Sequence, residues 1–246
     1  MTIDRDSTVP LYIQLKEHLR QQIENGSYAP GSRLPSEREL ADTFQVSRMT
    51  ARQAIRLLAT DGFISAHVGK GTFVLKPRID QELLLLTSFT EDIRQRGMTP
   101  RSRIIRAGIE RANQEEAEQL KVSEGAEVIM LSRVRLADED PIAWEICTIN
   151  HRMCPGILDR HNFGQDSLYQ VMRDEYGIRL LWADQLISAR MPSREEREAL
   201  DLDTKTPVLS LTRVTYTDHD QPAEYVRSVY RCDRYQLRTI LRYTNG

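Results

Sequence analysis

The chain has 246 residues, of which 40% are hydrophobic and 28% are charged, with a formal net charge of −2 at pH 7. This is the composition of a soluble globular protein, and the longest apolar run, Leu83–Leu86, is too short to span a bilayer. No apolar core follows the charged start Asp4–Asp6, which argues against a signal peptide. Three cysteines without Cys-x-x-Cys spacing indicate a reducing compartment, so we expect a cytoplasmic protein without a membrane partner.

The charge is divided unevenly along the chain. Residues 1–78 hold 11 Lys/Arg and 8 Asp/Glu, a net charge of +3, which leaves −5 for the remainder. A basic N-terminal part joined to an acidic C-terminal part favours a DNA reader that carries a separate sensor.

The first predicted element is an amphipathic helix. Leu11, Leu15, Leu19 and Ile23 recur every four residues and share one helix face, and Gly26 follows as a stop signal. This period predicts that the apolar face packs into a core.

Two shorter helices are expected next. Ser36 and Glu39 have the spacing of a capping box, in which each side chain bonds the backbone N–H of the other residue. Ser47 caps the following helix after a turn at Gln45–Val46. That helix should bury Ala51, Ile55 and Leu58 and leave Arg48, Arg52, Gln53 and Arg56 on its other faces.

A short hairpin completes the N-terminal part. Residues 63–67 and 72–75 read as strands around the tip Val68–Gly71, whose two glycines allow close approach to a duplex while Lys70 supplies charge. Helices and hairpin in this order predict a winged helix-turn-helix over residues 8–75. The alternative is a solvated, charge-laced helix pair.

At these residues the sequence resembles the GntR family of bacterial transcription regulators. The matching motifs are Pro10-Leu11-Tyr12, Pro30-Gly31, Leu34-Pro35-Ser36-Glu37 and Gly71-Thr72-Phe73-Val74. The resemblance implies that double-stranded DNA is contacted by Arg38, Ser47, Arg48, Thr50, Arg52 and the wing residues Gly69, Lys70 and Gly71. We assign Arg38 and Arg52 to base edges, where arginine reads guanine, and the other side chains mainly to phosphate.

The polar, proline-containing stretch 76–82 reads as a linker. Residues 83–244 then contain an internal repeat, because a shift of 80 residues gives 12 identities in the 47 positions from Gly97 to Ala143. Each copy reads as a helix, a strand, a short acidic helix and a strand hairpin. Two such copies predict an α+β domain with one mixed, mostly antiparallel sheet.

The repeat brings equivalent groups around one axis. Thr87 and Ser167 each precede a predicted helix, so both helix starts could direct N–H groups at one anion. Arg133 and Arg135 lie two apart on a strand and share a face, which suits a doubly charged partner such as phosphate. Alternatively, Arg133 serves the fold, because Arg213 is its mate in the repeat.

This second part resembles the effector-binding domain of HutC-type GntR regulators, known as UTRA, which shares its fold with chorismate lyase. The matching marks are Leu86–Asp92, Arg96-Gly97, Arg133-Val134-Arg135 and Ser228–Tyr235. The likeness is greatest to members that sense amino-sugar phosphates. It implies effector contacts at Ser88, Phe89, Thr90, Arg133, Arg135, Glu145, Ser167, Glu224 and Tyr230, with Asp166 standing where such members tend to have a second serine. Thr87, from the repeat, and Tyr169 are further candidates.

We therefore expect a homodimeric, ligand-responsive regulator, and by family resemblance a repressor, that binds a palindromic operator and is released by a small anionic metabolite. The rival classes are a lyase-like enzyme and an architectural DNA binder without a ligand. No Ser/His/Asp order, nucleotide-binding loop or metal spacing is found, so we expect no enzyme activity and no cofactor. The nearest approach to a metal motif, His151-x-x-Cys154, reads as a surface loop.

Overall fold

The computed structural model describes residues 3–5, 7–67, 71–76 and 78–241. It divides into two compact units, residues 1–79 and 80–246, which are taken separately below. Within the described part of the chain, no helix is long and apolar enough to cross a membrane.

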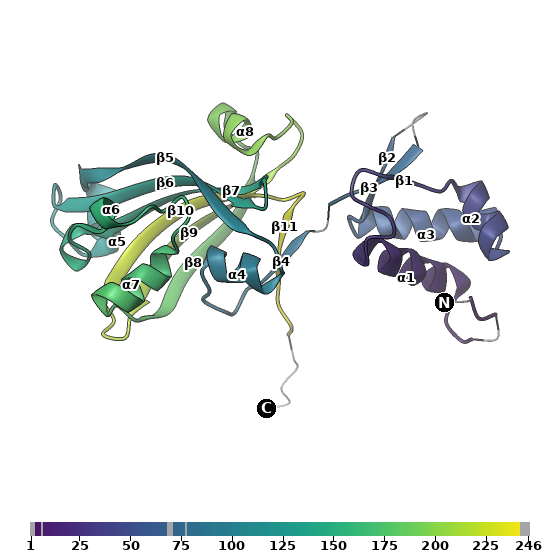
Figure 1. Cartoon of the computed structure of the whole chain (residues 1–246), viewed down its shortest axis with the longest axis horizontal. Helices are drawn as coiled ribbons and strands as arrows, with labels where there is room; N and C mark the ends of the chain where they lie inside the picture. The colour runs from purple at the N-terminus through teal and green to yellow at the C-terminus, as the bar shows by residue number, and fades with distance from the viewer. Residues whose placement is uncertain (1–2, 6, 68–70, 77, 242–246) are drawn as a thin grey trace. The chain divides into compact units, whose positions relative to one another are not determined.

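The first unit is a three-helix bundle with a small sheet (Figure 1). Its elements are α1 (Leu11–Glu24), β1 (Arg33–Leu34), α2 (Glu37–Phe44), α3 (Arg48–Thr60), β2 (Ile64–His67) and β3 (Gly71–Val74), with the strands in the order β1-β3-β2. Leu15, Leu19 and Ile23 of α1 are buried as the four-residue period predicts, in one core with Leu40 and Leu58. The strand β1 has no sequence signal, since it is only two residues long.

Both predicted caps of the helix-turn-helix are present. The Ser36 hydroxyl accepts from Glu39 N and the Glu39 carboxylate accepts from Ser36 N, which closes the capping box of α2. Ser47 accepts from Thr50 N at 3.0 Å and begins α3. Gln45 makes the turn between the helices in a left-handed conformation, with φ of 52°.

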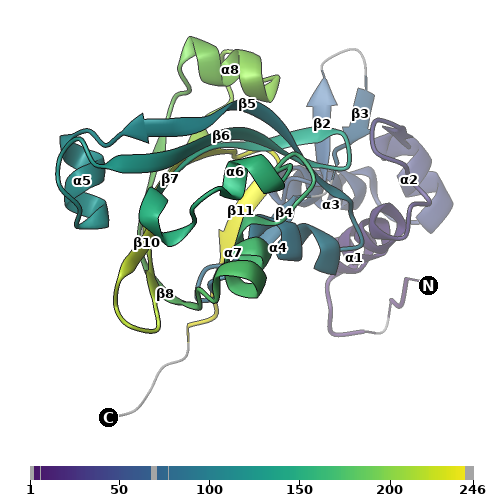
Figure 2. The same ribbon diagram turned by 60° about the vertical axis from the view of Figure 1, so that its left-hand side comes forward.

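The second unit is built on a six-stranded sheet in the order β5-β6-β7-β10-β9-β8, in which every pairing is antiparallel. Its helices pack on both faces (Figures 1 and 2). The elements are β4 (Ile79–Glu82), α4 (Phe89–Gln95), β5 (Pro100–Arg111), α5 (Gln114–Leu120), β6 (Glu127–Ala137), β7 (Asp140–Asn150), η1 (His151–Met153), α6 (Ile157–Arg160), α7 (Leu168–Tyr176), β8 (Leu180–Arg190), α8 (Arg194–Leu200), β9 (Val208–Thr217), β10 (Pro222–Arg231) and β11 (Tyr235–Arg238). The α+β class with a winged helix-turn-helix and a sheet domain is confirmed.

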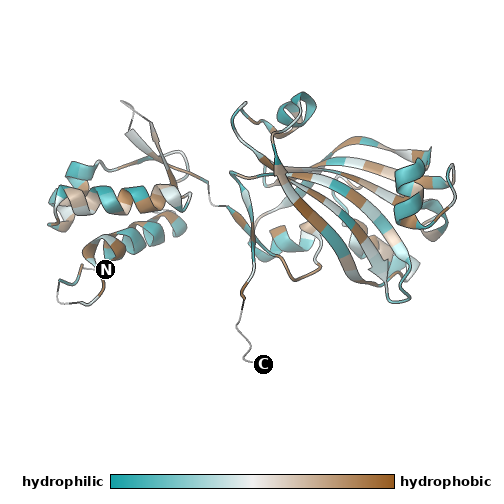
Figure 3. Ribbon diagram, turned by 180° about the vertical axis from the view of Figure 1, so that it is seen from behind, coloured by the Kyte–Doolittle hydropathy of each residue, from teal (hydrophilic) through white to brown (hydrophobic). Residues whose placement is uncertain are grey.

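Alternation along the strands separates the two faces of this sheet. Leu131, Cys147 and Val226 pack against α6 and α7 on one face. Val128, Val214 and Tyr225 pack against α5, and Val134, Val208 and Val229 pack against α8, on the other face. Figure 3 shows the resulting hydrophobic bands across neighbouring strands.

Equivalent elements recur along the second unit. The helix α5 begins at Gln114 and α8 at Arg194, 80 residues later, and each is closed by a capping box at its start. Their C-caps, Lys121 and Asp201, adopt the same left-handed conformation, with φ of 52° and 51°. The central pair β7 and β10 joins the two halves of the sheet.

The stretch expected as a linker is partly a strand. Ile79–Glu82 forms β4, which pairs with β11 in a separate two-stranded sheet, and Ile79 is buried. The sequence signal is weak here because a four-residue strand with one buried apolar side chain resembles a polar connector.

Candidate functional site

The helix-turn-helix presents its arginines to solvent. Arg38, Arg48 and Arg52 are exposed, as predicted, on α2 and α3. The hydroxyls of Ser47 and Thr50 lie 2.8 Å apart and bond one another at the start of α3. These two side chains therefore form the cap at the N-terminus of α3.

The side chain of Arg52 is fixed by hydrogen bonds to a carboxylate, whereas the side chain of Arg38 is not. The Nε of Arg52 donates to both carboxylate oxygens of Glu37, whereas Arg38 Nε lies 3.8 Å from Asp42, beyond hydrogen-bond distance. The side chains of Arg52 and Arg38 remain 61% and 76% exposed. Both arginine side chains are therefore accessible to a DNA duplex without a change in the fold of the domain.

At the tip of the wing, Gly69 and Lys70 lie outside the described residues. Gly71 begins β3 with φ of 110°, and a Cβ there would come within 2.7 Å of Arg33 Nε. The positive φ favours glycine here, whereas the contact with Arg33 could be relieved by movement of that exposed side chain. The exposed Arg33 is a basic residue of the wing that sequence reasoning missed.

Nine of the eleven predicted effector residues line one cavity, here called the arginine cavity. They are Ser88, Phe89, Thr90, Arg133, Arg135, Glu145, Ser167, Tyr169 and Glu224. Cys147, Leu168, Arg213 and Val226 complete its lining. The walls are the starts of α4 and α7, and the floor is the face of the sheet formed by β6, β7, β9 and β10.

Thr87 and Tyr230 lie elsewhere. They line a second cavity, the tyrosine cavity, named for Tyr230 and Tyr235 and sharing Phe89, Glu145 and Arg213 with the first. Thr87 precedes α4, as predicted, but the N-cap of α4 is Ser88, which closes a capping box with Glu91. Thr87 instead accepts from Gln81 Nε2 at 2.9 Å. Ser167 caps α7, as predicted.

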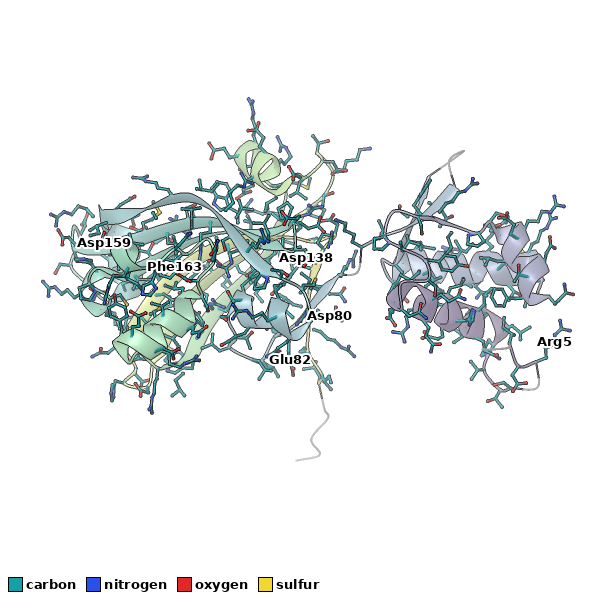
Figure 4. The ribbon with its side chains drawn as sticks, in the orientation of Figure 1. Arg5, Asp80, Glu82, Asp138, Asp159 and Phe163 are labelled. Atoms are coloured by element: carbon teal, nitrogen blue, oxygen red, sulfur yellow. The ribbon has the colours of Figure 1, made fainter. Side chains whose placement is uncertain are left out.

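Arg133 and Glu145 form a buried ion pair across the β6–β7 ladder, where they are direct partners in the register. Arg133 donates its Nε to Glu145 at 3.0 Å and its Nη1 to the carbonyl of Phe163 at 3.4 Å. Figure 4 labels Phe163, which packs on the α7 side of the sheet. Burial alone would raise the pKa of Glu145, but Arg133 and Arg135 outweigh it and hold that pKa below its ordinary value.

Arg135 is less well satisfied than Arg133. It is 4% exposed, stacks 4.5 Å from the Phe89 ring centroid and donates Nη2 to Thr90 Oγ1 at 3.1 Å. Its Nε is buried without a hydrogen-bond partner. Burial and the neighbouring charge of Arg133 lower the pKa of Arg135 to about 10, which indicates a cation lacking its full complement of negative charge.

The charged lining of the arginine cavity does not balance. Three guanidinium groups, Arg133, Arg135 and Arg213, face two carboxylates, Glu145 and Glu224, which leaves a formal charge of +1. A buried, uncompensated cation is costly, so such a cavity favours an anion.

Asp166 does not add negative charge to this cavity. Its carboxylate accepts from Asn162 N at 2.9 Å and lies 3.7 Å from His161 Nδ1, within the loop that precedes α7. Asp166 is absent from the lining of both cavities. An aspartate at this position therefore does not put its carboxylate beside an anion bound in the arginine cavity.

Two family models match this chain. "Bacterial regulatory proteins, gntR family" matches residues 11–74, and "UTRA domain" matches residues 95–236, more than half of the chain. The chain belongs to the GntR family of bacterial regulatory proteins. Its C-terminal unit is a UTRA domain, which confirms the resemblance drawn from the motifs.

Individual relatives extend over almost the whole chain. The HTH-type transcriptional repressor NagR of Bacillus subtilis (strain 168) is 39% identical over 235 residues, 96% of each protein. The mannosyl-D-glycerate transport/metabolism system repressor MngR of Escherichia coli (strain K12) is 28% identical, over 94% of this chain and 95% of MngR. The crystal structure of PhnF from Mycobacterium smegmatis is 30% identical with a TM-score of 0.74, and covers 94% of this chain and 100% of PhnF.

These comparisons decide between the rival classes. The GntR family consists of regulatory proteins, which confirms a transcription regulator over a lyase-like enzyme. Cys154 of the His151-x-x-Cys154 pair is buried among apolar side chains, and no group of three or more potential metal ligands occurs within the described ranges.

One charged residue that lines the arginine cavity was not assigned from the sequence. Arg213 lines both cavities and donates Nη2 to Tyr169 Oη at 3.0 Å. The repeat offset marks it as the mate of Arg133, so a signal for it existed in the sequence.

Proposed function

We propose that this chain is a metabolite-responsive repressor that binds a palindromic operator as a homodimer and is released by a small anionic effector, a sugar phosphate. The DNA-binding domain comprises residues 8–75, and the effector-binding domain comprises residues 83–244. In the dimer, two α3 helices enter successive major grooves, and effector binding in the sensor changes the spacing of the readers. A tenfold loss of operator affinity needs only about 1.4 kcal/mol of difference between the two states.

The unbalanced charge of the arginine cavity is the observation that carries this proposal. Arg135 offers a buried Nε donor without a partner, beside the paired Arg133. Ser88 and Ser167 begin helices at the cavity wall, which adds positive potential there. A phosphate would supply several acceptor oxygens and the missing negative charge.

The names of relatives support a carbohydrate-derived effector. NagR and MngR are both named as repressors, and MngR is named for a mannosyl-D-glycerate system. Mannosyl-D-glycerate carries a carboxylate, so the alternative is the same DNA-binding regulator with a carboxylate or uncharged effector. In that case Arg133 serves the fold through Glu145.

The test begins with operator selection. Duplexes chosen from a random library by the purified protein should contain inverted half-sites, and light scattering at micromolar concentration should give a dimer mass. Fluorescence anisotropy of the selected duplex should then fall when a hexose 6-phosphate is added. A monomer would refute the dimer, and a salt-sensitive affinity unmoved by every metabolite would indicate an architectural binder.

A further inference from the structure

Arg213 on β9 lies where the arginine cavity meets the tyrosine cavity and lines both. Its side chain is 25% accessible, compared with 4% for Arg133 and 5% for Arg135. A ligand that occupies both cavities would therefore lie against Arg213.

The charge of Arg213 is already compensated. Its Nη2 lies 3.5 Å from Glu224 Oε1, and Glu224 is 1% exposed. Glu224 also accepts hydrogen bonds from the Tyr169 hydroxyl, from Thr215 Oγ1 at 3.0 Å and from Cys147 Sγ at 3.2 Å. The acceptor capacity of Glu224 is thus largely used inside the protein, which makes this carboxylate an anchor for Arg213.

The Nε of Arg213 is buried and has no partner, unlike the Nε of its repeat mate Arg133. The register explains the difference. Glu145 stands directly opposite Arg133, whereas Val226 stands opposite Arg213, and Glu224 stands opposite Thr215, two residues further along β9. The second carboxylate therefore meets the Nη end of its arginine and leaves the Nε–H unused.

Resting on the proposed function, we propose that Arg213 donates its Nε–H to a neutral oxygen of the effector, a hydroxyl or carbonyl, while Arg133 and Arg135 hold the anionic group. Because Glu224 neutralises Arg213, a second anionic group here would face Glu145 and Glu224 without a free counter-charge. Arg213 is then a specificity-determining residue that selects, among phosphates, those with an oxygen-bearing body of the size of a sugar. A ligand without an oxygen at this place would leave the buried Nε–H of Arg213 without a hydrogen-bond acceptor, which strongly disfavours its binding.

The test uses Arg213→Lys, which keeps the charge beside Glu224 but has no counterpart of the Nε–H. Isothermal titration with inorganic phosphate and with glucose 6-phosphate gives one affinity ratio for each protein. The expected result is a wild-type ratio in favour of the sugar phosphate that falls about tenfold in the variant, with phosphate affinity within twofold. The matched control is Arg227→Lys on β10, which lines neither cavity and should leave the ratio unchanged.

Three outcomes separate the hypotheses. An unchanged ratio in Arg213→Lys, with a melting temperature like that of the wild type, would overturn the role of Arg213. Glucose 6-phosphate binding no more tightly than phosphate to the wild type would do the same. Failure of both probes to bind the wild type would instead defeat the proposed anionic effector.

Discussion

The Nε of Arg52 donates to both carboxylate oxygens of Glu37, at 3.2 and 3.0 Å, and so joins the two helices of the helix-turn-helix. The ion pair is exposed and contributes at most about 1 kcal/mol to folding. In the DNA complex that we propose, its more important consequence would be orientation, because a guanidinium held through Nε keeps both Nη groups in a defined plane, available to a guanine edge.

Glu37→Gln should therefore reduce discrimination at the base pair read by Arg52 by roughly threefold to fivefold, the equivalent of an exposed ion pair. Anisotropy with the selected operator and a single-mismatch duplex measures this ratio. Asp42→Asn is the matched control, since it removes the same charge from α2 at a residue that is not hydrogen-bonded to Arg38. An equal loss of discrimination in Glu37→Gln and Asp42→Asn would show that the effect comes from the removed charge alone.

Substitution of Arg48 and of Arg52, both on α3, should affect DNA binding in different ways. Arg52→Ala should relax sequence preference, whereas Arg48→Ala should weaken all duplexes alike and lower the slope of log affinity against log salt by about 1. Salt titrations on operator and unrelated duplexes check both statements. Indistinguishable profiles would contradict the division between base and phosphate contacts.

The ion pairs of Glu145 predict a pH dependence of stability. Because Arg133 and Arg135 hold its folded pKa below the ordinary value, its contribution is present above the unfolded pKa of about 4.3 and is lost as pH falls through the folded value. Melting temperatures of the wild type and Glu145→Gln should therefore converge as the pH drops below about 4.3. A gap that does not narrow at all between about pH 5 and pH 3 would place the loss of stability in packing.

Asp166 offers a check on the cavity itself. Asp166→Asn should leave phosphate affinity within about twofold, because a charge outside the cavity lining acts through solvent and is screened. Calorimetry with inorganic phosphate tests this. An affinity gain of tenfold or more would mean that the carboxylate faces the anion.

Sequence reasoning reached the elements with strong local signals. The capping box at Ser36, the Ser47 cap and the helix Leu168–Tyr176 are present because a hydroxyl, a carboxylate and an apolar period all act over a few residues. The two-residue strand β1 and the strand β4 were missed because each depends on pairing with a distant strand.

The lining of the arginine cavity could likewise be predicted only in part from the sequence. Offset alone aligned Thr87 with Ser167, but the cap of α4 is Ser88, one residue later. Offset also pointed to Arg213 as a copy of Arg133, but Val226 stands opposite Arg213 where Glu145 stands opposite Arg133. Which residue stands opposite another is set by strand pairing and cannot be read from the repeat offset alone.

The most direct test of the account is the affinity of the arginine cavity for an anion. Titration calorimetry with inorganic phosphate and hexose 6-phosphates should show binding to the wild type that is lost at least tenfold in Arg135→Gln, which removes the excess positive charge. Because burial makes that charge costly, the unliganded variant should melt no lower than the wild type. Binding only of uncharged ligands, or equal phosphate affinity in the variant, would contradict an anionic effector.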